Sequence, residues 1–153
     1  MTRQNAVNVH ATAIVLGSRG LLFVGPSGCG KSSTALSCLL TAADKGRFSA
    51  LVADDQVFVS SINGRLVARR PASIANIAEL RGGGIVTLPS LCSAVIDCAV
   101  LPVRSPDTER LPPLNETYLL PDGATLPLVR LPLLTGLQAY DALRLVLPRN
   151  LMI

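Results

Sequence analysis

Residues 25–32 read Gly-Pro-Ser-Gly-Cys-Gly-Lys-Ser and match the phosphate-binding pattern G-x-x-x-x-G-K-[ST] at every fixed position. The apolar run Leu21–Val24 precedes them, and a segment with helical apolar spacing begins at Lys31. Glycines let the backbone curl so that successive amide N–H groups point at a phosphate, and the N-terminus of the helix adds a favourable dipole. The pattern therefore predicts a buried strand, a phosphate loop and a helix in succession.

Two side chains of this loop are suited to nucleotide chemistry. Lys31 is placed to reach the β- and γ-phosphates, and the hydroxyl of Ser32 is placed to ligate Mg²⁺. The expected cofactors are accordingly ATP and Mg²⁺. The expected nucleotide-binding residues are Gly25, Pro26, Ser27, Gly28, Cys29, Gly30, Lys31, Ser32 and Ser33.

A pair of carboxylates follows the next apolar run. The predicted strand Ser49–Ala53 leads directly into Asp54 and Asp55. A phosphate loop needs an aspartate at the end of a neighbouring strand to help hold the metal. Since adjacent residues on a strand point to opposite sides, we expect the two carboxylates to have different roles, one at the metal and one as proton acceptor.

The rest of the chain predicts one α/β domain over residues 1–153, with a mixed sheet and flanking helices. Short strands are expected within residues 7–16, 85–88 and 94–101, and a hairpin is expected around Asn63-Gly64. A short helical segment is predicted from Pro71 to Ala78, a surface loop over residues 102–124, and a final helix from Thr135 or Gly136 to about Leu147.

Composition excludes several classes of function. The net charge is +4 with scattered cations, and aromatic residues make up 3%, so neither a basic stripe nor a stacking platform for nucleic acid is expected. No apolar run reaches the ~18 residues of a membrane span. The cysteines form no C-x-x-C pair and His10 is the only histidine, so no zinc site is expected. A cytoplasmic protein that binds neither membrane nor nucleic acid is predicted.

Four segments together resemble the catalytic domain of the HPr kinase/phosphorylase family. Their order and spacing agree with that family over about residues 7–88. They are Val9-His10, the loop 25–32 followed by Thr34-Ala35-Leu36, Leu51-Val52-Ala53-Asp54-Asp55, and Glu79-Leu80-Arg81-Gly82-Gly83-Gly84.

This resemblance implies a P-loop kinase fold like that of phosphoenolpyruvate carboxykinase. It implies ATP-dependent phosphorylation of a serine of HPr, the phosphocarrier protein of the sugar phosphotransferase system, and a homo-oligomeric enzyme. It also implies the reverse reaction, in which inorganic phosphate removes the phosphoryl group from phosphoserine-HPr and releases pyrophosphate. The implied catalytic residues are Asp54, His10, Lys31 and Arg81, and the implied metal ligands are Ser32, Asp55 and Glu79.

The chain also departs from the family pattern. Ser33 stands where the family usually has glutamate, and the chain is expected to be a shortened form without the family's N-terminal domain. The family's Arg-Pro-Gly-Arg-Asn segment has no clear counterpart, which leaves Arg104, Arg110 and Arg130 as candidate phosphate or partner contacts. Two alternatives stay open, a small-molecule kinase with an enclosed acceptor pocket and a nucleotide-sensing module without catalysis.

Overall fold

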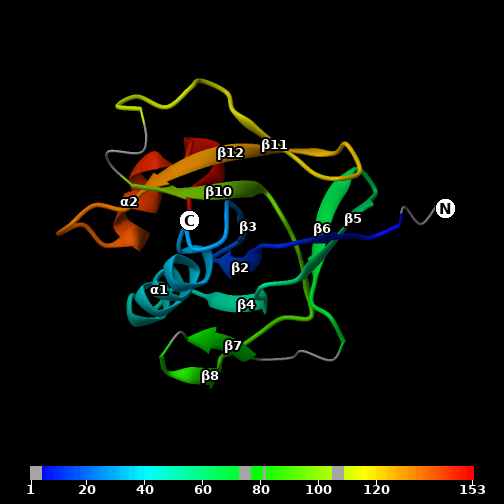
Figure 1. The fold of residues 1–153 in the computed structure, drawn as a ribbon, viewed down its shortest axis with the longest axis horizontal. Coiled ribbons are helices and arrows are strands. Elements are labelled where there is room, and N and C mark those ends of the chain that lie inside the picture. Colours follow the sequence, from blue (N-terminus) through cyan, green and yellow to red (C-terminus); the bar gives the residue numbers. More distant parts are fainter. Residues whose placement is uncertain (1–4, 73–76, 81, 105–108) are drawn as a thin grey trace.

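The computed structural model describes residues 5–72, 77–80, 82–104 and 109–153 (Figure 1). The first elements are β1 (Val7–Val9), β2 (Thr12–Leu16), β3 (Arg19–Phe23), α1 (Lys31–Asp44), β4 (Ser49–Ala53), β5 (Val57–Ile62), β6 (Arg65–Arg69) and β7 (Ile77–Leu80). They are followed by β8 (Gly84–Thr87), β9 (Ser93–Val95), β10 (Cys98–Val103), β11 (Thr117–Leu119), β12 (Thr125–Pro132), α2 (Ala139–Val146) and the 3-10 helix η1 (Arg149–Leu151).

The strand ahead of the phosphate loop lies inside a mixed sheet. Within the described residues this sheet has six strands in the order β11-β12-β10-β3-β2-β4. β10 runs parallel to β3 and β12, whereas β2 runs antiparallel to β3 and β4. The predicted α/β fold with a mixed sheet and flanking helices is therefore confirmed.

The central strands are buried on both faces, which explains their continuous apolar sequences. In β2, Ile14 and Leu16 pack into the cluster formed with α1 and α2, while Ala13 and Val15 pack into a second cluster on the other face. That second face is covered by the described sheet β1-β5-β6-β9. Figure 1 shows the two helices on one side of the central strands, with β5 and β6 on the other. The phosphate loop is consequently anchored to a rigid, fully packed strand.

Most of the predicted N-terminal elements are confirmed. The helix begins at Lys31 and the strand before the carboxylates spans Ser49–Ala53, both as predicted. The hairpin turn has positive φ at Asn63 (51°) and at Gly64 (76°), as a type I′ turn requires. In the described part of the chain, no helix has the length and apolar character needed to cross a membrane.

Three predictions for the remaining segments need correction. The helix expected from Pro71 to Ala78 is wrong at its end, because Ile77 and Ala78 belong to β7, which pairs with β8; residues 73–76 lie outside the described residues. The segment 102–124 is not all loop, because β10 continues to Val103 and β11 pairs with β12. The last helix begins at Ala139, later than predicted.

Gly20 in β3 is a point where two backbones approach closely. A Cβ atom at this position would lie 1.8 Å from the carbonyl oxygen of Val95. The Gly20 amide also donates to the Asp97 carboxylate at 3.0 Å, and the Asp97 amide donates to the Gly20 carbonyl at 2.8 Å. The chain before β10 is thus held against β3 by contacts that leave no room for a side chain.

We expect Gly20→Ala to lower the free energy of unfolding by about 3 kcal/mol or more, because the backbone must shift to accept the methyl group. Urea denaturation measures the change. Gly46→Ala is the matched control: Gly46 has φ 70° and open space around a built Cβ, so only the left-handed backbone costs energy, about 1–2 kcal/mol. Equal losses at the two positions would contradict the steric argument.

Candidate functional site

Glycine is required at both ends of the phosphate loop. Gly25 has φ 133°, and a Cβ there would lie 2.8 Å from the sulfur of Cys29 and 2.9 Å from Leu101. Gly30 has φ 96° and forms the N-cap of α1. An L side chain rarely adopts such backbone angles, so these positions need glycine for both conformation and space.

The first turn of α1 presents its backbone donors to the loop. The first intrahelical bond runs from the Thr34 amide to the Gly30 carbonyl at 2.9 Å. The amides of Lys31, Ser32 and Ser33 precede this bond and have no acceptor within the helix. Among the described residues, no side chain caps this helix end. An anion is therefore the natural partner of these donors.

Lys31 adds a buried charge to the same place. Its side chain is 7% exposed, and Nζ donates to the carbonyls of Gly25 at 2.9 Å and Pro26 at 3.2 Å. An ammonium group has three N–H donors, so one remains for a phosphate oxygen. The carbonyls hold the ammonium against the loop, where its charge favours a bound phosphate.

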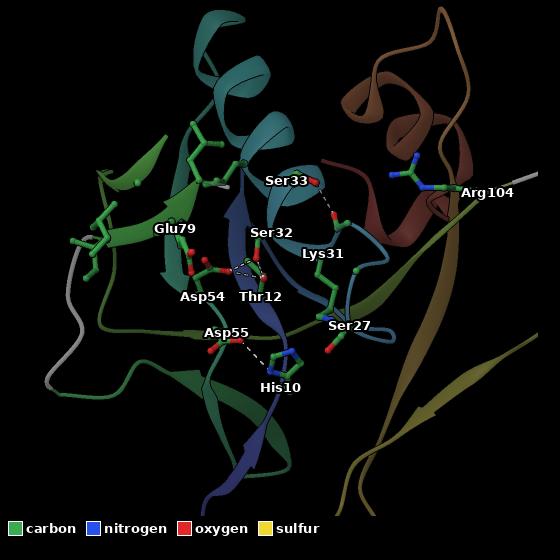
Figure 2. A pocket seen from close by; sticks show the side chains of 18 residues that line it. His10, Thr12, Ser27, Lys31, Ser32, Ser33, Asp54, Asp55, Glu79 and Arg104 are labelled. Atoms are coloured by element: carbon green, nitrogen blue, oxygen red, sulfur yellow. Dashed lines mark hydrogen bonds and ion pairs between the residues drawn. The ribbon is translucent and has the colours of Figure 1, made fainter. Parts of the chain in front are cut away.

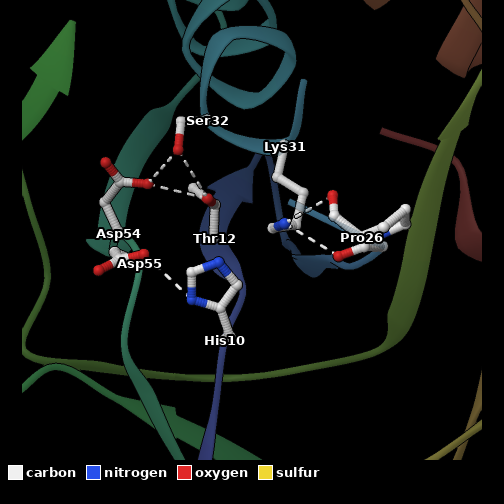
Figure 3. A network of polar contacts seen from close by, with 8 residues as sticks. His10, Thr12, Pro26, Lys31, Ser32, Asp54 and Asp55 are labelled. Carbon is white, nitrogen blue, oxygen red and sulfur yellow. Dashed lines mark hydrogen bonds and ion pairs between the residues drawn. The ribbon is translucent and has the colours of Figure 1, made fainter. Parts of the chain in front are cut away.

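Asp54 is tied to the phosphate loop (Figure 3). Its Oδ1 accepts a hydrogen bond from Ser32 Oγ at 2.7 Å and another from Thr12 Oγ1 at 2.9 Å. The two hydroxyl oxygens are themselves 3.4 Å apart. β4 thus delivers a carboxylate to the loop serine, and β2 fixes that carboxylate with a threonine that is 1% exposed.

Asp55 faces a different partner. Its backbone has φ 71°, and the Gln56 amide donates to the Asp54 carbonyl at 2.9 Å, which is the hydrogen bond of a γ-turn centred on Asp55. This turn directs the Asp55 carboxylate to His10, whose Nδ1 lies 3.1 Å from Oδ1. Both side chains are exposed, by 69% for Asp55 and 56% for His10. The expectation that the two aspartates point to different partners agrees with this geometry.

These groups line one cleft of about 970 Å³ (Figure 2). Glu79 points from β7 toward Asp54, and Arg104 reaches the first turn of α1 from the opposite side. The described lining residues are His10, Thr12, Ser27, Gly28, Gly30, Lys31, Ser32, Ser33, Leu36, Asp54, Asp55, Ile77, Ala78, Glu79, Leu80, Gly84, Ile85 and Arg104. Two sides of the loop therefore differ, with carboxylates on one and an arginine on the other.

The structure brings most of the residues singled out in the sequence together, with some exceptions. Arg81 lies outside the described residues. Of the three late arginines, Arg104 lines the cleft, whereas Arg130 donates to both carboxylate oxygens of Glu116, at 2.7 Å and 3.1 Å. Arg110 is exposed and is not among the described residues that line the cleft. The bidentate contact makes Arg130 a structural residue of the β12 region.

Sequence reasoning missed Thr12 entirely and could not choose Arg104 from the three arginines. A signal for Thr12 existed, because it lies two positions after His10 and alternate residues of an extended chain share a side. No local signal marked Arg104, since its position depends on the parallel pairing of β10 with β3. Long-range pairing of this kind is invisible in a local motif.

The oxygen donors fit Mg²⁺ better than a softer metal. The hydroxyl of Ser32 and the carboxylate of Asp54 are adjacent, and Glu79 points toward the same place. The described residues contain no group of three His, Cys, Asp or Glu side chains able to hold a metal alone. Mg²⁺ in phosphate-transfer sites takes one or two carboxylates and completes its shell with phosphate oxygens and water, so this donor set suits it.

Comparison with known proteins gives this site its context. A family model described as the HPr serine kinase C-terminal domain matches residues 3–95. The chain belongs to this family. It is 36% identical over 97 residues to the HPr kinase/phosphorylase of Clostridium tetani, covering 62% of this chain and 30% of that protein. It is 34% identical over 97 residues to the HPr kinase/phosphorylase of Mycoplasmopsis pulmonis, covering 61% of this chain and 29% of that protein.

The fold comparison extends the likeness beyond the matched segment. The HPr(Ser) kinase/phosphatase from Coxiella burnetii superposes with a TM-score of 0.71 at 23% identity, covering 85% of this chain and 81% of that chain. The P-loop kinase type of fold predicted from the sequence is confirmed. The chain spans 25–30% of the length of the curated relatives it matches. The segment matched by the family model, residues 3–95, contains the phosphate loop and the aspartate pair.

Proposed function

We propose that this chain is an ATP- and Mg²⁺-dependent protein kinase that phosphorylates a serine of an HPr-type phosphocarrier. The observation that carries the proposal is the meeting of a complete phosphate loop and two carboxylates with separate partners in one cleft. A loop alone would serve nucleotide binding. A second carboxylate placed away from the loop serine supplies what transfer to a hydroxyl requires, a proton acceptor.

The hydrogen bonds suggest how the two aspartates divide the chemistry. The family resemblance implies that Asp54 is the catalytic base and that Asp55 and Ser32 hold the metal. In the structure Ser32 pairs with Asp54, whereas Asp55 contacts His10 and is open to solvent. We therefore assign Asp54, Ser32 and Glu79 to the metal and Asp55 to the acceptor proton.

In this mechanism the loop amides and Lys31 bind the phosphates and offset the charge on the transferring group. Asp55 accepts the proton of the serine hydroxyl as its oxygen attacks the γ-phosphorus and the bond to the β-phosphate oxygen breaks. His10, 3.1 Å from Asp55, holds that carboxylate in its orientation. Mg²⁺, which Asp54, Ser32 and Glu79 would hold, would supply further neutralisation of the phosphate charge.

The reverse reaction uses the same groups and remains part of the proposal. An oxygen of inorganic phosphate attacks the phosphorus of phosphoserine, the bond to the serine oxygen breaks, and pyrophosphate forms. Protonated Asp55 returns its proton to the leaving serine oxygen. The loop that holds a nucleotide phosphate can hold free phosphate by the same amides.

The exposure of the proton-transfer pair favours a protein acceptor. Asp55 and His10 are more than half exposed, so the acceptor end of the cleft is open to a chain segment. A small-molecule kinase would enclose its acceptor, because enclosure supplies most of the contacts with a small ligand. A nucleotide sensor needs no positioned proton acceptor beside the phosphate site.

The homo-oligomeric state and the cytoplasmic location stay predictions, as does the single domain over residues 1–153.

The test is direct transfer. The purified chain, ATP and Mg²⁺ are incubated with HPr-type carrier from the same organism, and intact-mass spectrometry reports the carrier. We expect one added phosphoryl group on a serine, removed again by excess inorganic phosphate with release of pyrophosphate. An unmodified carrier despite measurable ATP binding would reject the HPr kinase and leave the small-molecule kinase or the sensor.

A further inference from the structure

Arg104 is brought to the phosphate loop by strand pairing. β10 runs parallel to β3, with Val100 opposite Phe23, and the Val24 amide continues the pairing by donating to the Val100 carbonyl at 2.9 Å. Parallel neighbours end at the same edge of a sheet. The chain therefore leaves β10 at Arg104 beside the point where it leaves β3 for the loop.

The guanidinium of Arg104 lies at the first turn of α1. A Cβ built on Gly30 would be 3.5 Å from Arg104 Nη2 and 3.5 Å from Ser33 Oγ, so both groups border the same small space. The side chain is exposed and has no ion-pair partner among the described residues. It brings a permanent positive charge and up to five N–H donors to the helix N-terminus.

The residues that line the cleft indicate how a bound nucleotide is oriented relative to Arg104. Asp54, Asp55 and His10 mark the end where the phosphoryl group leaves the nucleotide. In Figure 2, Arg104 lies on the opposite side of Lys31 from Asp54 and Asp55. A nucleotide whose γ-phosphate faces the aspartates must extend its α-phosphate and nucleoside toward the opposite side of Lys31.

We propose that Arg104 is a nucleotide-binding residue that contacts the α-phosphate end of ATP and ADP. The proposal rests on the proposed kinase function for the direction of the nucleotide. Ser33, whose hydroxyl donates to the Gly30 carbonyl at 3.3 Å, is uncharged, so Arg104 is the cation on this side of the described cleft. Arg104 thereby adds affinity for a nucleoside diphosphate and takes no part in the transfer step.

ADP is the decisive ligand, because it has the α-phosphate and lacks the γ-phosphate. We expect Arg104→Met to weaken ADP binding about tenfold in isothermal titration calorimetry, since a charge-assisted contact is lost. In the kinase assay KM for ATP should rise by a similar factor, while kcat stays within about twofold. Arg104→Lys should recover part of the ADP affinity, because it keeps the charge and loses the planar fork.

Arg110→Met is the matched control, since it removes the same charge from an exposed arginine that does not line the described cleft. It should leave ADP binding unchanged. An unchanged ADP affinity in Arg104→Met, or an equal loss in the control, would overturn the proposal, as would a fall in kcat with ADP binding intact. Titration with ADP needs no phosphate acceptor, so this result is independent of whether HPr is the substrate.

Discussion

We expect Lys31→Ala to lower turnover in the proposed phosphate transfer by about 10³-fold or more. The Lys31 ammonium is buried and bridges the carbonyls of Gly25 and Pro26, so its position is fixed before the nucleotide arrives. In the proposed mechanism its charge offsets the negative charge on the transferring phosphoryl group, and alanine supplies neither the charge nor the donor. Transfer from labelled ATP to the HPr-type carrier measures the loss.

The control for this experiment is Lys45→Ala. Lys45 follows α1 and makes a long ion pair with Asp141, 3.9 Å, at the surface. Its removal should leave turnover unchanged, because exposed ion pairs contribute little and the site is distant in sequence from the loop. Circular dichroism shows whether each variant is folded. A folded Lys31→Ala protein with normal turnover would exclude the loop as the transfer site.

The phosphate loop could be predicted because its requirements are local. Positive φ at Gly25 and Gly30, and the short approach of Cys29 to Gly25, are consequences of a few consecutive residues. The buried strand before the loop and the helix after it could likewise be predicted from the spacing of their apolar residues. The strand before Asp54 was predicted with its observed bounds for the same reason.

Features that depend on distant contacts could not be predicted. The strand β7 contains the tail of a predicted helix, because Ala78 pairs with Val86 in β8 and its side chain joins the cluster under α1. Tertiary packing overrides a local preference in such a short segment. β11 was not predicted for a related reason. Its three residues follow a proline-rich stretch, and they form a strand because they pair with β12.

The different partners of the two aspartates also depend on contacts between residues that are distant in the sequence. Sequence predicts that neighbours on a strand diverge, but it does not say which one turns toward the loop serine. That choice is made by the left-handed backbone of Asp55 and by Thr12, which donates to Asp54 from β2. A buried threonine from another strand therefore distinguishes two otherwise equivalent carboxylates.

Asparagine substitutions of the two aspartates should have separable effects. Asp55→Asn should lower kcat about 10²–10⁴-fold with ADP affinity preserved, because the amide cannot accept the hydroxyl proton. Asparagine tolerates the left-handed φ of 71° at this position, so the γ-turn is kept. Steady-state kinetics with the HPr-type carrier and calorimetry with ADP measure the two quantities.

Asp54→Asn tests the other half of the assignment. The amide can still accept hydrogen bonds from Ser32 and Thr12, so the network shown in Figure 3 is preserved while the negative charge is lost. We expect activity to require a higher Mg²⁺ concentration, by about tenfold, with part of kcat restored at saturating metal. The charge of Asp54 and the proton-accepting oxygen of Asp55 thus give different signatures. If Asp54→Asn instead loses turnover at every Mg²⁺ concentration while Asp55→Asn only raises the Mg²⁺ requirement, the proton acceptor is Asp54 and the hydrogen bond to Ser32 does not identify the metal ligand.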